Sequence, residues 1–246
     1  GRCRADEGAR HQRGQCVGVG ASMTPYYSHA GITIYHGDCL PLMSELRAGL
    51  IVTDPPYFLP ARHYSTRKEF PWSLSDVAML EHFYRDWFTA AKACVGLDGV
   101  AYVFCDGQSY PVFYALAYPH FRRVVPLVWD KQVSFNGYAW RHQHELVLYA
   151  ERDAAPAIKT GDGDVLACRA VPIEERDHPA QKPAALMQRL IEKHAGSVLD
   201  PFCGSGSTLL AAAQIGRVAV GIESDERYCE IAARRIEGRC SGQPGQ

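Results

Sequence analysis

The 246-residue chain has no pair of cysteines in C-x-x-C spacing and no H-E-x-x-H motif. Its nine cysteines are scattered and odd in number, which argues against a disulfide framework and against a zinc site. We therefore expect reduced cysteines in a cytoplasmic protein. His142 and His144 in "RHQHE" would share one face of a strand, but further ligands are lacking nearby, so we predict no metal site.

Long apolar runs are also lacking. No stretch approaches the ~18 residues that span a membrane, so we predict no membrane partner. Residues 1–22 lack the apolar core of a signal peptide. We expect Met23 to be the natural start, with residues 1–22 disordered or not native, a single domain over residues 23–240 and a tail at 241–246. The net charge of −1 indicates no general affinity for nucleic acid, although a local basic face would suffice.

Segments with strand character alternate with segments of helical spacing along most of the chain. Strands are expected at residues 31–38, 50–57, 97–106, 122–131, 144–152, 196–202 and 217–223, and helices at residues 39–49, 76–95, 107–118, 182–195, 206–216 and 225–238. Asp76 is the expected N-cap of the second helix. The alternation predicts an α/β fold with one mostly parallel, twisted sheet and helices on both faces. Residues 153–177 are polar and read as irregular.

The stretch "SVLDPFCGSGST" (197–208) reads as a strand, a glycine-rich turn and a helix. Gly204 and Gly206 would let the backbone pass close to a ligand at the helix N-terminus. No lysine follows Gly206, which excludes a phosphate-binding P-loop. Asp200 would lie at the strand tip and point at the ligand, and Glu223 follows about 20 residues later, as a ribose-binding acid does. The pattern predicts a nucleotide-type cofactor site. The alternative is an ordinary tight turn, with Glu223 merely capping the last helix.

Such a loop normally opens a domain, but here it arrives near the end of the chain. We therefore expect a circularly permuted order of elements. In that order the strands near 197–200 and 217–222 would lie beside the strands near 32–36 and 50–53.

The tetrapeptide "DPPY" (54–57) follows an apolar strand directly, and its parts suit the handling of a planar amine. The Asp54 carboxylate can accept a hydrogen bond from an exocyclic NH2, and a main-chain carbonyl at Pro55 is a second acceptor beside a residue that has no N–H. Tyr57 offers a ring on which a base can stack. Two acceptors out of the ring plane would draw the nitrogen toward tetrahedral geometry and free its lone pair. The alternative is that the prolines only end the strand and Tyr57 is a core aromatic.

Together, "TDPPY" and "DPFCGSGST" resemble the DNA amino-methyltransferases that use S-adenosylmethionine and modify adenine N6 or cytosine N4. The catalytic motif precedes the cofactor motif, an order that resembles the β class of this family. "IYHGDCL", "LVWDK…HELVLYA" and "HPAQKP" (178–183) also match, so the resemblance covers residues 30 to 238. It implies the Rossmann-like methyltransferase fold.

The resemblance implies roles for the matched positions. The catalytic residues, which would bind the target amine and the base, would be Asp54, Pro55, Pro56 and Tyr57. The cofactor S-adenosylmethionine would be bound by Asp38, Lys182, Asp200, Pro201, Phe202, Cys203, Gly204, Gly206, Thr208, Glu223 and Ser224.

Within the cofactor set, the resemblance implies distinct places for individual side chains. Asp38 would lie near the cofactor adenine, Glu223 would hold the ribose, and Lys182 would lie near the methionine end. Cys203 would be a small pocket residue and not a nucleophile, since the family uses no covalent intermediate.

A base inside a duplex cannot reach the cofactor, so the target must be flipped out of double-stranded DNA. In the loop at residues 58–75, Arg62, Arg67 and Lys68 stand among aromatic residues and are the expected DNA contacts. The alternative is a solvated surface loop. Residues 153–177 occupy the place of the family's target-recognition region. This segment is short, which predicts a short recognition site or help from a second subunit in a homodimer.

The leading hypothesis is a site-specific DNA methyltransferase acting on adenine N6, because the cytosine-N4 group more often begins its motif with serine than with an aspartate such as Asp54. Cytosine N4 stays open as an alternative, as does methylation of RNA or of a protein amide, although those enzymes usually carry asparagine at this place. A nicotinamide-dependent oxidoreductase would share the glycine loop but leave "DPPY" unexplained. Two intact motifs argue against a DNA-binding protein without catalysis. A cognate restriction nuclease is a further expected partner.

Overall fold

The computed structural model describes residues 23–57, 77–134, 139–154, 161–175 and 181–240. Its strands are β1 (Tyr27–His29), β2 (Ile32–His36), β3 (Ala48–Thr53), β4 (Val95–Cys105), β5 (Arg123–Asp130), β6 (His144–Glu151), β7 (Val165–Ala167), β8 (Val198–Asp200) and β9 (Ala219–Glu223). Its helices are α1 (Cys39–Glu45), α2 (Val77–Cys94), α3 (Ser109–Ala117), α4 (Ala184–Glu192), α5 (Ser207–Gln214) and α6 (Glu226–Cys240), and residues Ile173–Glu175 form the 3-10 turn η2. None of the described helices combines the length and the apolar character needed to cross a membrane.

The nine strands of the described residues join one sheet in the order β1-β2-β9-β8-β3-β4-β6-β5-β7. The five strands from β2 to β4 run parallel, while β6 is antiparallel to both β4 and β5. The late strands β8 and β9 lie between β2 and β3, as the permuted order predicts. The α/β class and the mostly parallel sheet are confirmed.

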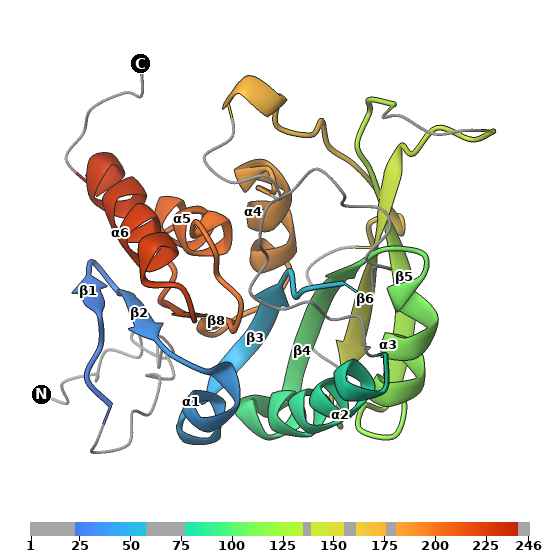
Figure 1. Ribbon diagram of the computed structural model, residues 1–246, viewed down its shortest axis with the longest axis horizontal. Coiled ribbons are helices and arrows are strands. Elements are labelled where there is room, and N and C mark those ends of the chain that lie inside the picture. Colours follow the sequence, from blue (N-terminus) through green and yellow to red (C-terminus); the bar gives the residue numbers. More distant parts are fainter. Residues whose placement is uncertain (1–22, 58–76, 135–138, 155–160, 176–180, 241–246) are drawn as a thin grey trace, which may run out of the picture.

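Helices α1, α2 and α3 cover one face of the sheet, and α4, α5 and α6 cover the other (Figure 1). A layer of buried side chains lies under each set of helices. The side chains of β3 alternate between them, with Ile51 in the first layer and Leu50 and Val52 in the second. All three are fully buried. A strand covered on both faces has no polar side, which explains why this stretch of sequence is apolar without alternation.

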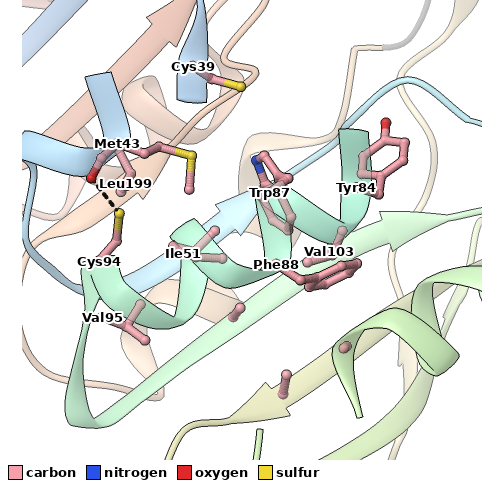
Figure 2. Close-up of a cluster of buried hydrophobic side chains, with 14 of the residues drawn as sticks. Cys39, Met43, Ile51, Tyr84, Trp87, Phe88, Cys94, Val95, Val103 and Leu199 are labelled. Atoms are coloured by element: carbon pink, nitrogen blue, oxygen red, sulfur yellow. Dashed lines mark hydrogen bonds between the residues drawn. The ribbon is translucent and has the colours of Figure 1, made fainter. Parts of the chain in front are cut away.

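Helix α2 is anchored by aromatic side chains on its inner face. Tyr84, Trp87 and Phe88 are spaced to share one face of a helix, and each has at most 1% of its surface exposed. Full burial of a side chain such as Phe88 stabilises the fold by roughly 1.5–3 kcal/mol. At the end of the helix, the Cys94 thiol donates a hydrogen bond to the Met43 carbonyl of α1 at 2.9 Å (Figure 2). These contacts fix α2, so that Tyr84 reaches the turn that follows β3.

Strands β3 and β8 are parallel neighbours from which the connections lead in opposite directions across the sheet. From β3 the chain continues through α2 on one face to β4, whereas from β8 it continues through α5 on the other face to β9. Ligands of open α/β sheets bind beyond the carboxyl ends of the strands at such a switch point. The fold therefore places a ligand site where Thr53 ends β3 and Asp200 ends β8.

Two features differ from the expected elements. A strand that the sequence does not indicate, β1, joins β2 through a turn in which Ala30 and Gly31 have φ of 49° and 81°, and positive φ at two successive positions is typical of a tight hairpin. The expected irregular character of residues 153–177 is wrong in part, because β7 pairs with β5 and η2 follows. Strand β7 has three residues, of which only Leu166 is buried. So short a strand shows no alternating pattern that could be found in the sequence.

The other expected strands and helices are present, with bounds that differ by a few residues. The expectations for residues 1–22, the loop at 58–75, the cap Asp76 and the tail at 241–246 lie outside the described residues. Parts of the segment 153–177 lie outside them as well.

Candidate active site

The ends of β3 and β8 are joined by a hydrogen bond between buried side chains. Thr53 Oγ1 donates to Asp200 Oδ1 at 2.6 Å, and the Phe202 N–H donates to the same oxygen at 3.2 Å. Burial raises the pKa of Asp200 to about 6. Asp200 is only 3% exposed, and its Oδ1 ties the ends of two strands together.

The glycine loop between β8 and α5 adopts a backbone that favours its glycines. Gly204 and Gly206 have φ of +50° and +80°, in the left-handed region where other residues are strained. A Cβ on Gly206 would lie 2.8 Å from the Cβ of Ala232 in α6, whereas a Cβ on Gly204 would meet no atom of the described residues within 4 Å. The loop is thus closed against α6 at one glycine and open at the other.

Glu223, at the end of β9, connects this loop to the start of α6. Its Oε2 accepts a hydrogen bond from the Gly204 N–H at 2.9 Å, and its Oε1 accepts one from the Asp225 N–H at 2.8 Å. The cap of α6 is Asp225, whose Oδ1 accepts from the Arg227 N–H at 2.9 Å. The alternative in which Glu223 merely caps the last helix does not account for its contact with the glycine loop.

Two further members of the expected cofactor set are exposed near the ends of β2 and β9. Asp38 Oδ1 accepts a hydrogen bond from the Leu40 N–H at 3.0 Å and so caps α1. The Ser224 carbonyl lies 3.1 Å from His36 Nε2. Both Asp38 and Ser224 stand at the carboxyl edge of the sheet, where the expected ligand would lie.

The remaining loop residues are buried to different degrees. Pro201, Cys203 and Thr208 are buried, and Phe202 is half-buried with its ring centroid 6.0 Å from that of Trp87. Burial raises the pKa of the Cys203 thiol well above its ordinary value. A thiol that stays protonated is a poor nucleophile, which fits the expectation that Cys203 is a small pocket residue and not a nucleophile.

The "DPPY" turn is held by two tyrosine hydroxyls. The Tyr57 hydroxyl donates to Asp54 Oδ1 at 2.6 Å, and the Tyr84 hydroxyl of α2 donates to the Pro56 carbonyl. The hydroxyl of Tyr84 therefore bonds the second proline of the motif. It does not occupy the Pro55 carbonyl, which is the expected second acceptor for the amine. Asp54 and Tyr57 are half-buried and Pro55 is buried.

Lys182 reaches Asp54 from the segment before α4. Its Nζ lies 2.6 Å from Asp54 Oδ2 and 3.1 Å from Glu145 Oε2, and Lys131 Nζ lies 2.6 Å from Glu145 Oε1. The four side chains are between 6% and 19% exposed and alternate in charge. The contacts of Lys182 are therefore with the "DPPY" motif and with Glu145, whereas the resemblance implies a place for it near the methionine end of the cofactor.

Glu145 and Lys131 belong to this cluster although no motif singles them out. Strands β5 and β6 are antiparallel with Trp129 opposite Glu145. This register brings Lys131, two residues after Trp129, to the same face and the same edge of the sheet. The signal in the sequence is a cation at the end of "LVWDK" and an acid at the start of "HELVLYA", two stretches that pair only once the hairpin is known.

The charges of the cluster act on one another. Burial raises the pKa of Asp54, an effect that Lys182 opposes and Glu145 reinforces. Burial also raises the pKa of Glu145, but the ammonium groups of Lys182 and Lys131 outweigh it and leave that pKa below its ordinary value. Burial lowers the pKa of Lys182, but the carboxylates of Asp54 and Glu145 outweigh it and raise that pKa. Lys182 therefore keeps its positive charge between two carboxyl groups.

Aromatic rings surround the Lys182 ammonium. Its Nζ lies 5.2 Å from the ring centroid of Phe104, 5.7 Å from that of Tyr57 and 6.0 Å from that of Trp129, distances at which a cation is attracted to a ring face. Burial and the neighbouring Asp54 raise the pKa of the Tyr57 hydroxyl well above its ordinary value. Tyr57 therefore remains a neutral hydrogen-bond donor to Asp54.

The described residues contain no group of three or more His, Cys, Asp or Glu side chains that could hold a metal ion. His142 and His144 are both exposed. The expected DNA contacts Arg62, Arg67 and Lys68 lie outside the described residues.

The site combines the Asp54 carboxylate, on the turn after β3, with the glycine loop after β8. The resemblance implies this combination of a catalytic turn and a cofactor loop. A family model described as DNA methylase (N6_N4_Mtase) matches residues 48–234. The chain belongs to this DNA methylase family. The resemblance is confirmed, and the enzyme is a DNA methyltransferase of the class that modifies adenine N6 or cytosine N4. The cofactor of the DNA methylases is S-adenosylmethionine, and the match favours this class over a nicotinamide-dependent oxidoreductase.

Individual DNA methylases are similar over most of the chain. The type II methyltransferase M2.DpnII of Streptococcus pneumoniae is 28% identical over 253 residues, covering 89% of this chain and 94% of that protein. The type II methyltransferase M.ScaI of Streptomyces caespitosus is 28% identical over 262 residues, covering 87% and 84%.

Solved structures of DNA methylases share the fold. The crystal structure of the M1.HpyAVI–SAM complex has a TM-score of 0.64 at 22% identity, over 83% of this chain and 98% of that chain. The cytosine-N4-specific PvuII DNA methyltransferase also has a TM-score of 0.64, at 19% identity, over 88% and 96%.

Proposed function

We propose that this DNA methylase transfers a methyl group from S-adenosylmethionine to the exocyclic N6 of an adenine flipped out of double-stranded DNA. The observation that carries the proposal is the position of Asp54. Its carboxylate stands directly beyond β3, whose end the Thr53–Asp200 hydrogen bond ties to the strand that leads into the glycine loop. An ionised carboxylate accepts hydrogen bonds and donates none, which suits an amino group. An aspartate at this place, where cytosine-N4 enzymes more often carry serine, favours adenine.

The "DPPY" turn supplies the contacts that the target amine requires. Asp54 Oδ1 accepts one hydrogen bond from Tyr57 and, with two lone pairs per oxygen, can accept another from the amine. The Pro55 carbonyl is the second acceptor, and the ring of Tyr57 offers a face for stacking. After methyl transfer the nitrogen carries a surplus proton. Asp54 Oδ1 is the base that takes this proton, and a pKa raised by burial makes it a better proton acceptor.

The residues at the glycine loop fit the cofactor. S-adenosylmethionine supplies a methyl group already activated on a sulfonium, so orientation carries most of the catalysis. Gly204 presents an open backbone, Glu223 a half-buried carboxylate suited to ribose hydroxyls, and Asp38 and Ser224 exposed polar groups from neighbouring strand ends. Phe202 would pack against the ligand with its accessible edge. The buried members of the set would shape the loop from beneath, namely Asp200, Pro201, Cys203, Gly206 and Thr208.

Contacts with DNA are part of the same proposal. Arg62, Arg67 and Lys68 in the loop at 58–75 would contact phosphates near the flipped base, and the short segment 153–177 would read the target sequence. A homodimer, a cognate restriction nuclease, the single domain and a cytoplasmic location stay predictions.

Transfer of a labelled methyl group to DNA tests the proposed activity. The protein would be incubated with S-adenosylmethionine labelled in the methyl group and with unmethylated DNA. We expect label in the DNA with the wild type and with Asp98→Ala, a control that removes an exposed carboxylate near the start of β4, but not with Asp54→Ala. S-adenosylmethionine should raise the melting temperature of all three proteins, and a nicotinamide dinucleotide should not. Stabilisation by the dinucleotide alone, or transfer by Asp54→Ala at the wild-type rate, would contradict the proposal.

A further inference from the structure

The Lys182 ammonium has an acceptor for each of its N–H donors among Asp54, Tyr57 and Glu145, the residues that we call the base site together with Lys182. An ammonium has three N–H donors, and three acceptors lie around Lys182 Nζ: Asp54 Oδ2 at 2.6 Å, Glu145 Oε2 at 3.1 Å and the Tyr57 hydroxyl at 3.3 Å. The side chain is only 6% exposed. A lysine whose three donors are used in this way is built into the base site and is not free to bind the carboxylate of a methionine.

The contact with Lys182 divides the work of the two Asp54 oxygens. Oδ2 is bonded to Lys182, which restricts rotation of the carboxylate about its bond to the rest of the side chain. Oδ1 is bonded to Tyr57 and keeps a lone pair for a further donor. Lys182, 128 positions later in the chain, therefore sets the orientation of Oδ1 through its bond to the other oxygen of the carboxylate.

An ammonium this close also reduces the attraction of Asp54 for the amine, because it offsets the negative charge of the carboxylate. Glu145 counters this effect, since its carboxylate shares the same ammonium at 3.1 Å. Lys131 in turn neutralises Glu145 from the other side at 2.6 Å. The alternation of charges lets Lys182 orient Asp54 without cancelling its charge.

We propose that Lys182 and Glu145 are positioning residues for methyl transfer, in which Lys182 fixes the Asp54 carboxylate for the target amine and Glu145 offsets the charge of Lys182. The inference rests on the proposed function, because it assigns Asp54 as the acceptor for the amine. It differs from the role that the sequence resemblance implies for Lys182, since a residue at the methionine end of the cofactor would determine cofactor affinity.

The proposal predicts opposite shifts of the pH–rate profile in two variants. Removal of the ammonium in Lys182→Met leaves Asp54 beside Glu145 alone, which raises the pKa of Asp54 and moves the acidic limb of methyl transfer to higher pH. Removal of the carboxylate in Glu145→Gln leaves Asp54 beside Lys182 alone, which lowers that pKa and moves the limb to lower pH. A neighbouring charge at these distances shifts a pKa by about one unit or more.

Other titratable groups face Asp54 from the elements packed around it, and they are the same in every variant. They are Tyr57 in the same turn, Tyr84 of α2, Cys105 of β4, Lys131 after β5 and Asp200 of β8. Burial raises the pKa values of both tyrosines and raises that of Cys105 to about 12. Asp200, whose pKa burial raises to about 6, contributes equally to all profiles, so differences between variants report on Asp54.

The experiment measures single-turnover methyl transfer to DNA from pH 5 to 9 and S-adenosylmethionine affinity by calorimetry, in the wild type, Lys182→Met, Lys182→Arg and Glu145→Gln. Lys92→Met is the matched control, because Lys92 pairs with Asp153 at 3.3 Å near the start of β4, at the end of that strand away from the site. We expect slower transfer in Lys182→Met and Glu145→Gln, limbs displaced in opposite directions by about one pH unit, and unchanged cofactor affinity. Lys182→Arg should restore the limb toward its wild-type position, and Lys92→Met should match the wild type.

Loss of cofactor affinity in Lys182→Met with an unmoved limb would overturn the proposal and return Lys182 to the cofactor site. If Lys182→Met does not fold, Glu145→Gln and Lys182→Arg keep the test open, and an unmoved limb in Glu145→Gln would overturn it. Wild-type protein that transfers no methyl group to DNA would instead contradict the proposed function, and the inference would fall with it.

Discussion

The hydroxyl of Thr53 donates a 2.6 Å hydrogen bond to the carboxylate of Asp200, although 147 residues separate them in the chain. Both side chains are buried, with exposures of 0% and 3%. They end the neighbouring strands β3 and β8, and each is followed at once by a motif of the site. The bond therefore joins the start of "DPPY" to the start of the glycine loop.

Thr53→Val keeps the shape of the side chain and removes this bond. The loss should destabilise the protein by about 1–3 kcal/mol, because a buried acceptor loses a donor, and should slow methyl transfer by disturbing Asp54. Urea unfolding measures the stability. The control is Thr89→Val on α2, whose exposed hydroxyl bonds the Arg85 carbonyl one helical turn earlier; its effect should stay within about 0.5 kcal/mol. Equal stability of the two variants would contradict the role given to Thr53.

Asp200 makes the stability depend on pH in a definite direction. Burial raises its pKa to about 6 from an ordinary value of 3.8, so the folded protein binds a proton that the unfolded chain has released between about pH 4 and pH 6. This contribution is present below pH 4 and is lost as the pH rises through 6. Asp200→Asn removes the titration while keeping an oxygen acceptor for Thr53. Relative to the wild type, the variant should gain roughly 2–3 kcal/mol between pH 4 and pH 7, as measured by urea unfolding across that range; a constant difference would contradict this assignment.

The fold and the two motifs follow from local patterns in the sequence. The apolar stretch that becomes β3 and the run "SVLDPF" predict buried strands by composition alone, and the glycines at 204 and 206 predict a tight loop because only glycine accepts their backbone easily. Asp54 can also be found from the local sequence, because it directly follows the apolar stretch that becomes β3.

The contacts that complete the site could not be predicted in this way, because they join distant elements. Thr53 reads as an ordinary β-branched strand residue until β8 is placed beside β3. Glu145 and Lys131 come together only through the antiparallel register of β5 and β6. The pairing of Lys182 with Asp54 depends on the position of α4 over the second face of the sheet, which no local pattern specifies.

The two loop glycines should respond differently to alanine. In Gly206→Ala the new Cβ would lie 2.8 Å from that of Ala232, so strain adds to an unfavourable backbone and the loss should exceed the ~1–2 kcal/mol of the backbone alone. In Gly204→Ala only the backbone term applies, but the methyl group would enter the open space where we place the cofactor. We expect the larger fall in melting temperature for Gly206→Ala. Gly204→Ala should retain more stability and yet lose S-adenosylmethionine affinity in calorimetry; full affinity would contradict the placement of the cofactor.

The basic loop should set the salt dependence of DNA binding. Each phosphate contact contributes about 0.9 to the slope of log affinity against log salt concentration. Replacing Arg62, Arg67 and Lys68 by alanine together should therefore reduce the slope by about 2–3 while leaving S-adenosylmethionine binding intact. Arg85→Ala, which removes an exposed arginine of α2 paired with Glu81, is the control and should leave the slope unchanged. An unchanged slope in the triple variant would contradict the role of the loop.

The identity of the methylated base decides whether Asp54 serves the amino group of adenine. Unmethylated DNA from several sources would be incubated with the protein and S-adenosylmethionine, digested to nucleosides and separated by mass spectrometry, with Asp54→Ala as the negative control. We expect N6-methyladenine with the wild type and none with the variant. N4-methylcytosine in its place would contradict the assignment to adenine, and the absence of both products from a protein shown to bind S-adenosylmethionine would contradict methylation of DNA.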